Sequence, residues 1–177
     1  MIEAHNHCFR LLTLGLRQLT VIALHIVLLE PEIPPNTGNV ARLCAATKTK
    51  LHLIEPFGFK LDDAQLKRAG MDYWQQVEWT RWPDWIAFQK MLPPDAQLWL
   101  VESNGPRLYT EAKFQPEDYL VFGRETAGLP KPLLEHSRER WLRIPMFNPE
   151  ARSLNLSNCV ALVLFEALRQ QGFPGAG

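Results

Sequence analysis

Three polar loops carry the residue types that could do chemistry on a ligand. The first contains Asn36 and Arg42, the second holds Glu125 close to two glycines, and the third spans residues 143–158 and includes Asn155. Amides, a carboxylate and a guanidinium can orient a substrate and hold an anion. Each residue alone also has an ordinary structural role, as a solvated helix residue, a loop acid or a helix cap. Three such loops together favour a binding site, because nearby glycines allow close backbone approach.

The elements around these loops predict how they are positioned. Each loop follows a short apolar run typical of a strand, and strands alternate with helical patterns along the chain. This order predicts an α/β domain with a mainly parallel sheet and helices on both faces. In such a sheet the three loops meet at one edge, where ligands bind. The expected strands are 25–29, 50–54, 76–80, 97–102, 119–122 and 141–144, and the expected helices are 36–47, 62–69, 84–91, 130–137 and 160–168.

Two segments carry more specific expectations. Residues 30–35 include three prolines and are expected to form a loop without helix, followed by a helix cap at Asn36. The last helix, 160–168, is apolar on nearly every side and is expected to be buried almost all round. Its apolar surface exceeds what one small sheet can cover. We therefore expect a homodimer whose interface includes this helix or residues 40–47.

Composition narrows the class of protein. The chain has 177 residues, 46% of them hydrophobic and 21% charged, as in one ordinary globular domain. Its formal net charge is zero, so any nucleic-acid binding must come from local patches or paired subunits. Three widely spaced cysteines, Cys8, Cys44 and Cys159, favour reduced thiols and a cytoplasmic location. The longest early apolar run, 21–29, is too short to cross a membrane.

Several common functions lack their sequence signatures. There is no G-x-G-x-x-G motif after the first strand, no P-loop and no G-x-S-x-G elbow. A dinucleotide enzyme, a P-loop nucleotide hydrolase and a serine hydrolase of the elbow type are therefore disfavoured. His5, His7 and Cys8 are close together but have no fourth ligand nearby, so no metal site is expected.

The three loops resemble the three ordered motifs of the SPOUT methyltransferases. The matching segments are 30–39, 122–130, and 143–146 with 152–158, and the likeness runs from about Leu24 to Gly175. Within that class the chain is similar to the small bacterial tRNA (cytidine/uridine-34-2′-O)-methyltransferases. The resemblance implies a C-terminal trefoil knot, bound S-adenosylmethionine, a homodimer, and 2′-O-methylation of the wobble nucleotide of tRNA, with leucine tRNAs as the expected substrates. It covers one domain, residues 23–177, and leaves residues 1–22 as an extension without a counterpart.

The resemblance also assigns roles by motif. A guanidinium stays protonated in proteins, so Arg42 is expected to hold a phosphate and stabilise a developing oxyanion rather than accept a proton. The expected catalytic residues are Arg42, Asn36, Glu125 and Asn155. The expected cofactor contacts are Val101, Gly123, Leu142, Ile144, Met146, Ser153 and Leu154. The expected RNA contacts are Arg42, Lys48, Lys67, Arg68, Arg124 and Arg152.

Two positions depart from the motifs. Arg124 stands where many relatives have proline, and Ala127 stands where a basic residue is common. The second departure could weaken RNA contact or alter substrate choice. It also makes a knotted RNA-binding protein without catalysis conceivable. A 2′-O-methyltransferase acting on rRNA or on another tRNA site is a further alternative, which the sequence does not separate from the first reading.

Overall fold

A seven-stranded sheet, parallel at every strand pair, forms the centre of the protein. The computed structural model describes residues 23–60, 74–148 and 150–176. Along the sheet the strand order is β3-β2-β1-β6-β4-β7-β5. The bounds are β1 His25–Leu29, β2 Lys50–Ile54, β3 Trp79–Trp82, β4 Leu98–Val101, β5 Arg107–Leu108, β6 Tyr119–Phe122 and β7 Trp141–Arg143.

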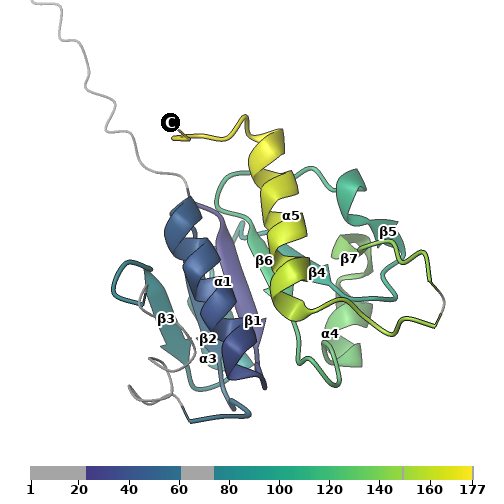
Figure 1. The fold of residues 1–177 in the computed structure, drawn as a ribbon, viewed down its shortest axis with the longest axis horizontal. Coiled ribbons are helices and arrows are strands. Elements are labelled where there is room, and N and C mark those ends of the chain that lie inside the picture. Colours follow the sequence, from purple (N-terminus) through teal and green to yellow (C-terminus); the bar gives the residue numbers. More distant parts are fainter. Residues whose placement is uncertain (1–22, 61–73, 149, 177) are drawn as a thin grey trace, which may run out of the picture.

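Helices cover both faces of this sheet, as the sequence predicted. Figure 1 shows α1 (Pro34–Thr47) and α5 (Leu156–Gln170) side by side on one face, and the two are in contact. The short helices α3 (Trp85–Lys90) and α4 (Lys131–His136) pack on the opposite face. Two 3₁₀ turns, Tyr109–Glu111 and Arg138–Arg140, complete the described elements.

The alternation of side chains along each strand builds a core on both faces. In β1, Ile26 and Leu28 pack with the α1 and α5 side, whereas Val27 and Leu29 pack with the α3 and α4 side. β1 and β6 are buried along their whole length, as expected for central strands of a parallel sheet. The loops that follow β1, β6, β4 and β7 therefore extend from a rigid scaffold.

Strand β7 passes under a short link between its two neighbours. β4 and β5 flank β7, yet only residues 102–106 join them, and both Val101 and Arg107 pair with Leu142. The Arg143 side chain donates hydrogen bonds to the carbonyls of Gly105, 2.8 Å, and Pro106, 2.7 Å. A Cβ atom on Gly105 would lie 2.4 Å from the carbonyl carbon of Leu142, so only glycine fits at this crossing. Such a crossing is what threading requires, and the trefoil knot itself stays a prediction.

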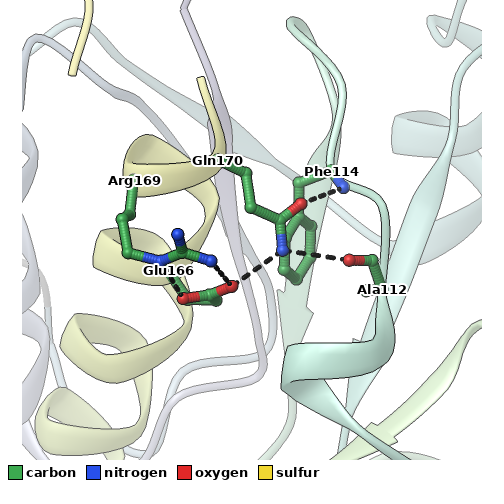
Figure 2. A network of polar contacts seen from close by, with 5 residues as sticks. All are labelled: Ala112, Phe114, Glu166, Arg169 and Gln170. Carbon is green, nitrogen blue, oxygen red and sulfur yellow. Dashed lines mark hydrogen bonds and ion pairs between the residues drawn. The ribbon is translucent and has the colours of Figure 1, made fainter. Parts of the chain in front are cut away.

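The C-terminal end of α5 is tied to the segment that precedes β6. Figure 2 shows the Gln170 side chain accepting a hydrogen bond from the Phe114 amide and donating to the Ala112 carbonyl, both at 3.0 Å. Its amide also donates to Glu166 at 2.8 Å, and Glu166 in turn is paired with Arg169. One side chain thus satisfies a backbone donor and a backbone acceptor, as a strand partner would.

Several sequence expectations need correction. The helix α1 begins at Pro34 rather than after Asn36, because prolines fit the first helical positions, where the N–H has no intrahelical partner. The last helix is not buried all round: Leu162 and Phe165 are 42% and 48% exposed. The strand expected at 76–80 is Trp79–Trp82, and the two-residue strand β5 was not expected. The helix expected at 62–69 lies outside the described residues.

Candidate active site

A chain of hydrogen bonds joins one residue from each of the three polar loops. The Asn36 amide nitrogen donates to the Glu125 carboxylate at 3.0 Å, and the Asn155 amide nitrogen donates to the Asn36 carbonyl oxygen at 2.8 Å. Asn155 also caps α5, since its oxygen accepts from the Ser157 N–H and hydroxyl. The structure therefore brings together three of the four predicted catalytic residues, at the edge of the sheet where β1 and β6 end.

Glu125 is held by the start of α1. Its two carboxylate oxygens accept hydrogen bonds from the backbone amides of Glu32, 2.8 Å, and Ile33, 3.3 Å. In return, the Glu32 carboxylate accepts from the Thr126 amide, 2.9 Å, and from the Thr126 hydroxyl. Each loop thus supplies a carboxylate that accepts hydrogen bonds from the other, and these bonds hold the loops after β1 and β6 together. It fixes the position of Asn36, which is only 5% exposed.

An ion pair adds a second tie between the same two loops. The Arg124 guanidinium pairs with Glu30, the residue directly after β1. Glu30 has a φ of 53°, a left-handed conformation that costs a non-glycine residue about 1 kcal/mol or more. Its backbone N–H nevertheless continues the sheet by bonding the Ile54 carbonyl at 2.8 Å. Arg124, expected to contact RNA, thus also has a structural partner.

The network borders a cavity of about 850 Å³, within the size range of small-molecule sites. Loops after β1, β4, β6 and β7 and the start of α5 line it, and its walls mix apolar and polar groups. The lining includes Asn36, Val101, Glu102, Gly123, Arg124, Glu125, Leu129, Lys131, Trp141, Ile144, Met146, Arg152, Ser153, Leu154, Asn155 and Cys159. Six of the seven predicted cofactor contacts are in this set.

Glycines shape the cavity where the loop 123–129 folds back on itself. A Cβ atom on Gly123 would lie 2.2 Å from the Gly128 carbonyl carbon, so a side chain there is excluded. Gly128 has a φ of +67°, and the loop closes through mutual backbone bonds between Arg124 and Gly128. Main-chain groups of this loop are therefore held at the cavity, where they can meet a ligand edge.

The other predicted site residues lie elsewhere. Leu142 is fully buried in the core under the 102–106 link and does not line the cavity. Arg42 is exposed on α1, outside the cavity lining. Lys48 follows the C-terminal end of α1, at the opposite edge of the sheet from Asn36. Lys67 and Arg68 lie outside the described residues.

Sequence reasoning missed four residues at this site. Glu32 and Thr126 hold the two loops together, and their positions within the motif segments 30–39 and 122–130 were the available signal. Glu102 lines the cavity directly after β4, and a carboxylate directly after a strand was the clue. The indole N–H of Trp141 has no hydrogen-bond partner among the described residues, although it is shielded from solvent beside the cavity.

One thiol in the cavity wall is poorly ionised. Burial, with a smaller effect from the Glu102 charge, raises the pKa of Cys159 to about 11. The thiolate is the reactive form of cysteine, so Cys159 is a poor nucleophile here.

Among the described residues, no cluster of three or more histidine, cysteine, aspartate or glutamate side chains is placed to hold a metal ion. No helix in the same part of the chain is long and apolar enough to span a membrane.

The parallel α/β fold and its cavity agree with comparisons to known proteins, which identify the class as that of the SPOUT methyltransferases. The chain belongs to the SpoU rRNA Methylase family, whose sequence model matches residues 23–165.

Similar proteins narrow the class further. A tRNA (cytidine(34)-2'-O)-methyltransferase of Saccharophagus degradans is 50% identical over 155 residues, which cover 86% of this chain and 98% of the relative. A protein of the same name from Escherichia coli K12 is 49% identical over 154 residues, covering 86% and 97%. A solved structure that describes 2-OH methylation of C/U34 on tRNA matches with a TM-score of 0.80 and 45% identity, covering 85% of this chain and 97% of the other.

Proposed function

We propose that this protein uses S-adenosylmethionine to methylate the ribose 2′-hydroxyl of nucleotide 34 in tRNA. The observation that carries the proposal is the Asn36–Glu125–Asn155 network at the mouth of a ligand-sized cavity. Relatives about 50% identical over most of the chain are named for this reaction. tRNA as substrate makes the cytoplasm the expected compartment.

The cavity residues suit the cofactor. Val101, Ile144 and Leu129 offer apolar walls to an adenine ring, and the loops offer backbone N–H and C=O groups to its edge. Met146, Ser153 and Leu154 line the same cavity. When bound, S-adenosylmethionine supplies an electrophilic methyl group. The protein then has to align the ribose hydroxyl with that methyl group and stabilise the charge that develops on oxygen.

Asn36 and Asn155 are the groups that can orient the substrate. Glu125 accepts three hydrogen bonds on its two oxygens, two of them from the backbone, so it positions Asn36 rather than reaching the substrate itself. Asn36 is fixed at both ends of its amide, since its oxygen accepts from Asn155 and its nitrogen donates to Glu125. The orientation of each amide follows from this bonding pattern.

A homodimer would bring Arg42 into the reaction. Within one chain Arg42 is exposed on α1, outside the cavity lining. Neighbouring α5 exposes Leu162 and Phe165, large apolar side chains that a second copy would cover. In that arrangement Arg42 of one subunit approaches the cavity of its partner and holds the tRNA phosphate. Light scattering tests the dimer, and a monodisperse monomer at micromolar concentration would contradict it.

Transfer of a labelled methyl group tests the function. Bulk tRNA and bulk rRNA are incubated separately with the protein and tritiated S-adenosylmethionine, and the labelled nucleosides are then identified. The proposal requires label in tRNA as 2′-O-methylcytidine or a 2′-O-methyluridine derivative. Label in rRNA alone identifies an rRNA methyltransferase, and cofactor binding without transfer to either RNA identifies an RNA-binding protein without catalysis.

A further inference from the structure

Glu102 is a carboxylate in the cavity wall to which no role has yet been assigned. It follows β4 directly and lies beside Val101, which lines the same cavity. No arginine, lysine or histidine among the described residues lies within ion-pair distance of it. A carboxylate without a cationic partner in a ligand cavity is a candidate to accept a hydrogen bond from the ligand.

Neutral donors fix the direction of this carboxylate. Oε2 accepts from the Leu129 amide at 2.9 Å, and Oε1 accepts from the Ser103 amide at 2.8 Å and hydroxyl at 3.0 Å. A carboxylate offers roughly four acceptor positions, so three donors leave about one position for a ligand. Gly128 makes room for the group, because a Cβ atom there would lie 1.9 Å from Oε2. The carboxylate is therefore held in place before any ligand binds.

The position of Glu102 along the sheet edge determines which part of the ligand it can contact. The orienting residue Asn36 follows β1, and Glu125 follows β6, whereas Glu102 follows β4 on the far side of β6. Neighbouring strands are about 4.8 Å apart, so β4 lies roughly 10 Å from β1. The reacting methyl must lie near Asn36. Glu102 is thus offset from the chemistry, toward the apolar walls of Val101 and Ile144.

Charge also argues against a contact with the reacting centre. Methyl transfer removes the positive charge of a sulfonium, so a carboxylate beside it would stabilise the ground state more than the transition state. A contact with a group whose charge does not change avoids that penalty. The ribose of the cofactor is joined directly to the adenine that the apolar walls would hold, and its hydroxyls are donors.

On these grounds we propose that Glu102 binds a ribose hydroxyl of the cofactor and sets the affinity of the site for adenosine compounds. The inference rests on the proposed use of S-adenosylmethionine. It makes Glu102 a binding residue, acting equally on the cofactor before and after methyl transfer. Its removal should therefore raise KM for the cofactor and leave kcat nearly unchanged.

Calorimetry with three adenosine ligands tests the assignment. S-adenosylmethionine, S-adenosylhomocysteine and 5′-methylthioadenosine share the ribose, but only the first is a sulfonium and the last lacks the amino-acid tail. Glu102→Gln should weaken all three by about tenfold or more, the effect of losing one hydrogen bond to a charged group. Glu135→Gln, which neutralises an exposed carboxylate on nearby α4, is the matched control and should leave all three affinities unchanged.

Each other outcome overturns the ribose contact in a distinct way. Weakening of S-adenosylmethionine alone would place Glu102 at the sulfonium. Weakening of both tailed ligands with unchanged 5′-methylthioadenosine would place it at the α-ammonium group, and no change in any ligand would remove it from the site. Wild-type protein that binds these ligands but methylates no RNA would contradict the proposed function while leaving the Glu102 test intact. Wild-type protein that binds none of them would overturn both.

Discussion

Asn155 caps helix α5 and also binds Asn36, and one substitution should remove only the second of these interactions. Its oxygen caps α5 through Ser157, while its nitrogen donates to Asn36. Asn155→Asp keeps the capping oxygen but replaces the donor with a second acceptor. That acceptor then faces the Asn36 oxygen, so Asn36 loses the bond that fixes its amide or turns away from Glu125.

The expected magnitudes follow from these bonds. In Asn155→Asp the helix cap, which contributes about 1 kcal/mol, is retained. The added negative charge at the helix N-terminus is mildly favourable, so the free energy of unfolding should change by less than about 1 kcal/mol. Loss of a preorganised polar contact in a catalytic site lowers kcat by about 100-fold or more. Asn155→Ala should lose both the helix cap and the bond to Asn36, and its free energy of unfolding should fall by about 1–2 kcal/mol.

Urea unfolding and single-turnover methylation of tRNA measure the two effects independently. Asn158→Asp is the matched control, because it adds the same charge to the first turn of the same helix, and it should leave activity unchanged. An Asn155→Asp protein that is stable and fully active would refute the role of the Asn36–Asn155 bond. Parallel loss of stability and activity in Asn155→Asp would show that the substitution acts through folding and not through the bond to Asn36.

Two further predictions concern stability. Gln170→Leu should lower the free energy of unfolding by about 2–3 kcal/mol, because it strands the Phe114 N–H and the Ala112 carbonyl, and an unchanged urea midpoint would contradict this anchor. Burial, reinforced by the nearby charges of His25 and Lys50, lowers the pKa of His52 from 6.5 to about 4. The unfolded state therefore binds the proton more readily, and the stability contributed by neutral His52 is present above pH 6.5 and lost as pH falls toward 4. The free energy of unfolding should be about 2 kcal/mol lower at pH 5 than at pH 7.5, and His52→Gln should reduce that difference. Equal pH dependence in both proteins would show that His52 is not its source.

The fold was predictable where local signals were strong. Strands His25–Leu29, Lys50–Ile54 and Tyr119–Phe122 match their predicted bounds, since each is a short largely apolar run that pairs at or near the centre of the sheet. Strand β5 has two residues and exists only because β7, more than thirty residues later, pairs with it. No local pattern can reveal such a strand.

The meeting of Asn36, Glu125 and Asn155 was predictable for a topological reason. Asn36 and Glu125 follow adjacent parallel strands and Asn155 precedes the helix beside them, so the order of elements alone brings them together. Which side of a strand a residue faces was harder to infer. Leu142 belongs to the core and its neighbour Trp141 to the cavity wall, a distinction fixed by the pairing of β7 under the 102–106 link.

The most direct test of the central claim uses a tRNA altered at one atom. Two tRNAs are prepared with identical sequence, one of which carries a 2′-deoxynucleotide at position 34, and each is incubated with the protein and labelled S-adenosylmethionine. We expect about one methyl group per molecule of the normal tRNA and none on the 2′-deoxy tRNA. Equal methylation of both tRNAs would contradict it, because the hydroxyl that the Asn36–Glu125–Asn155 network is proposed to orient would then not be the acceptor.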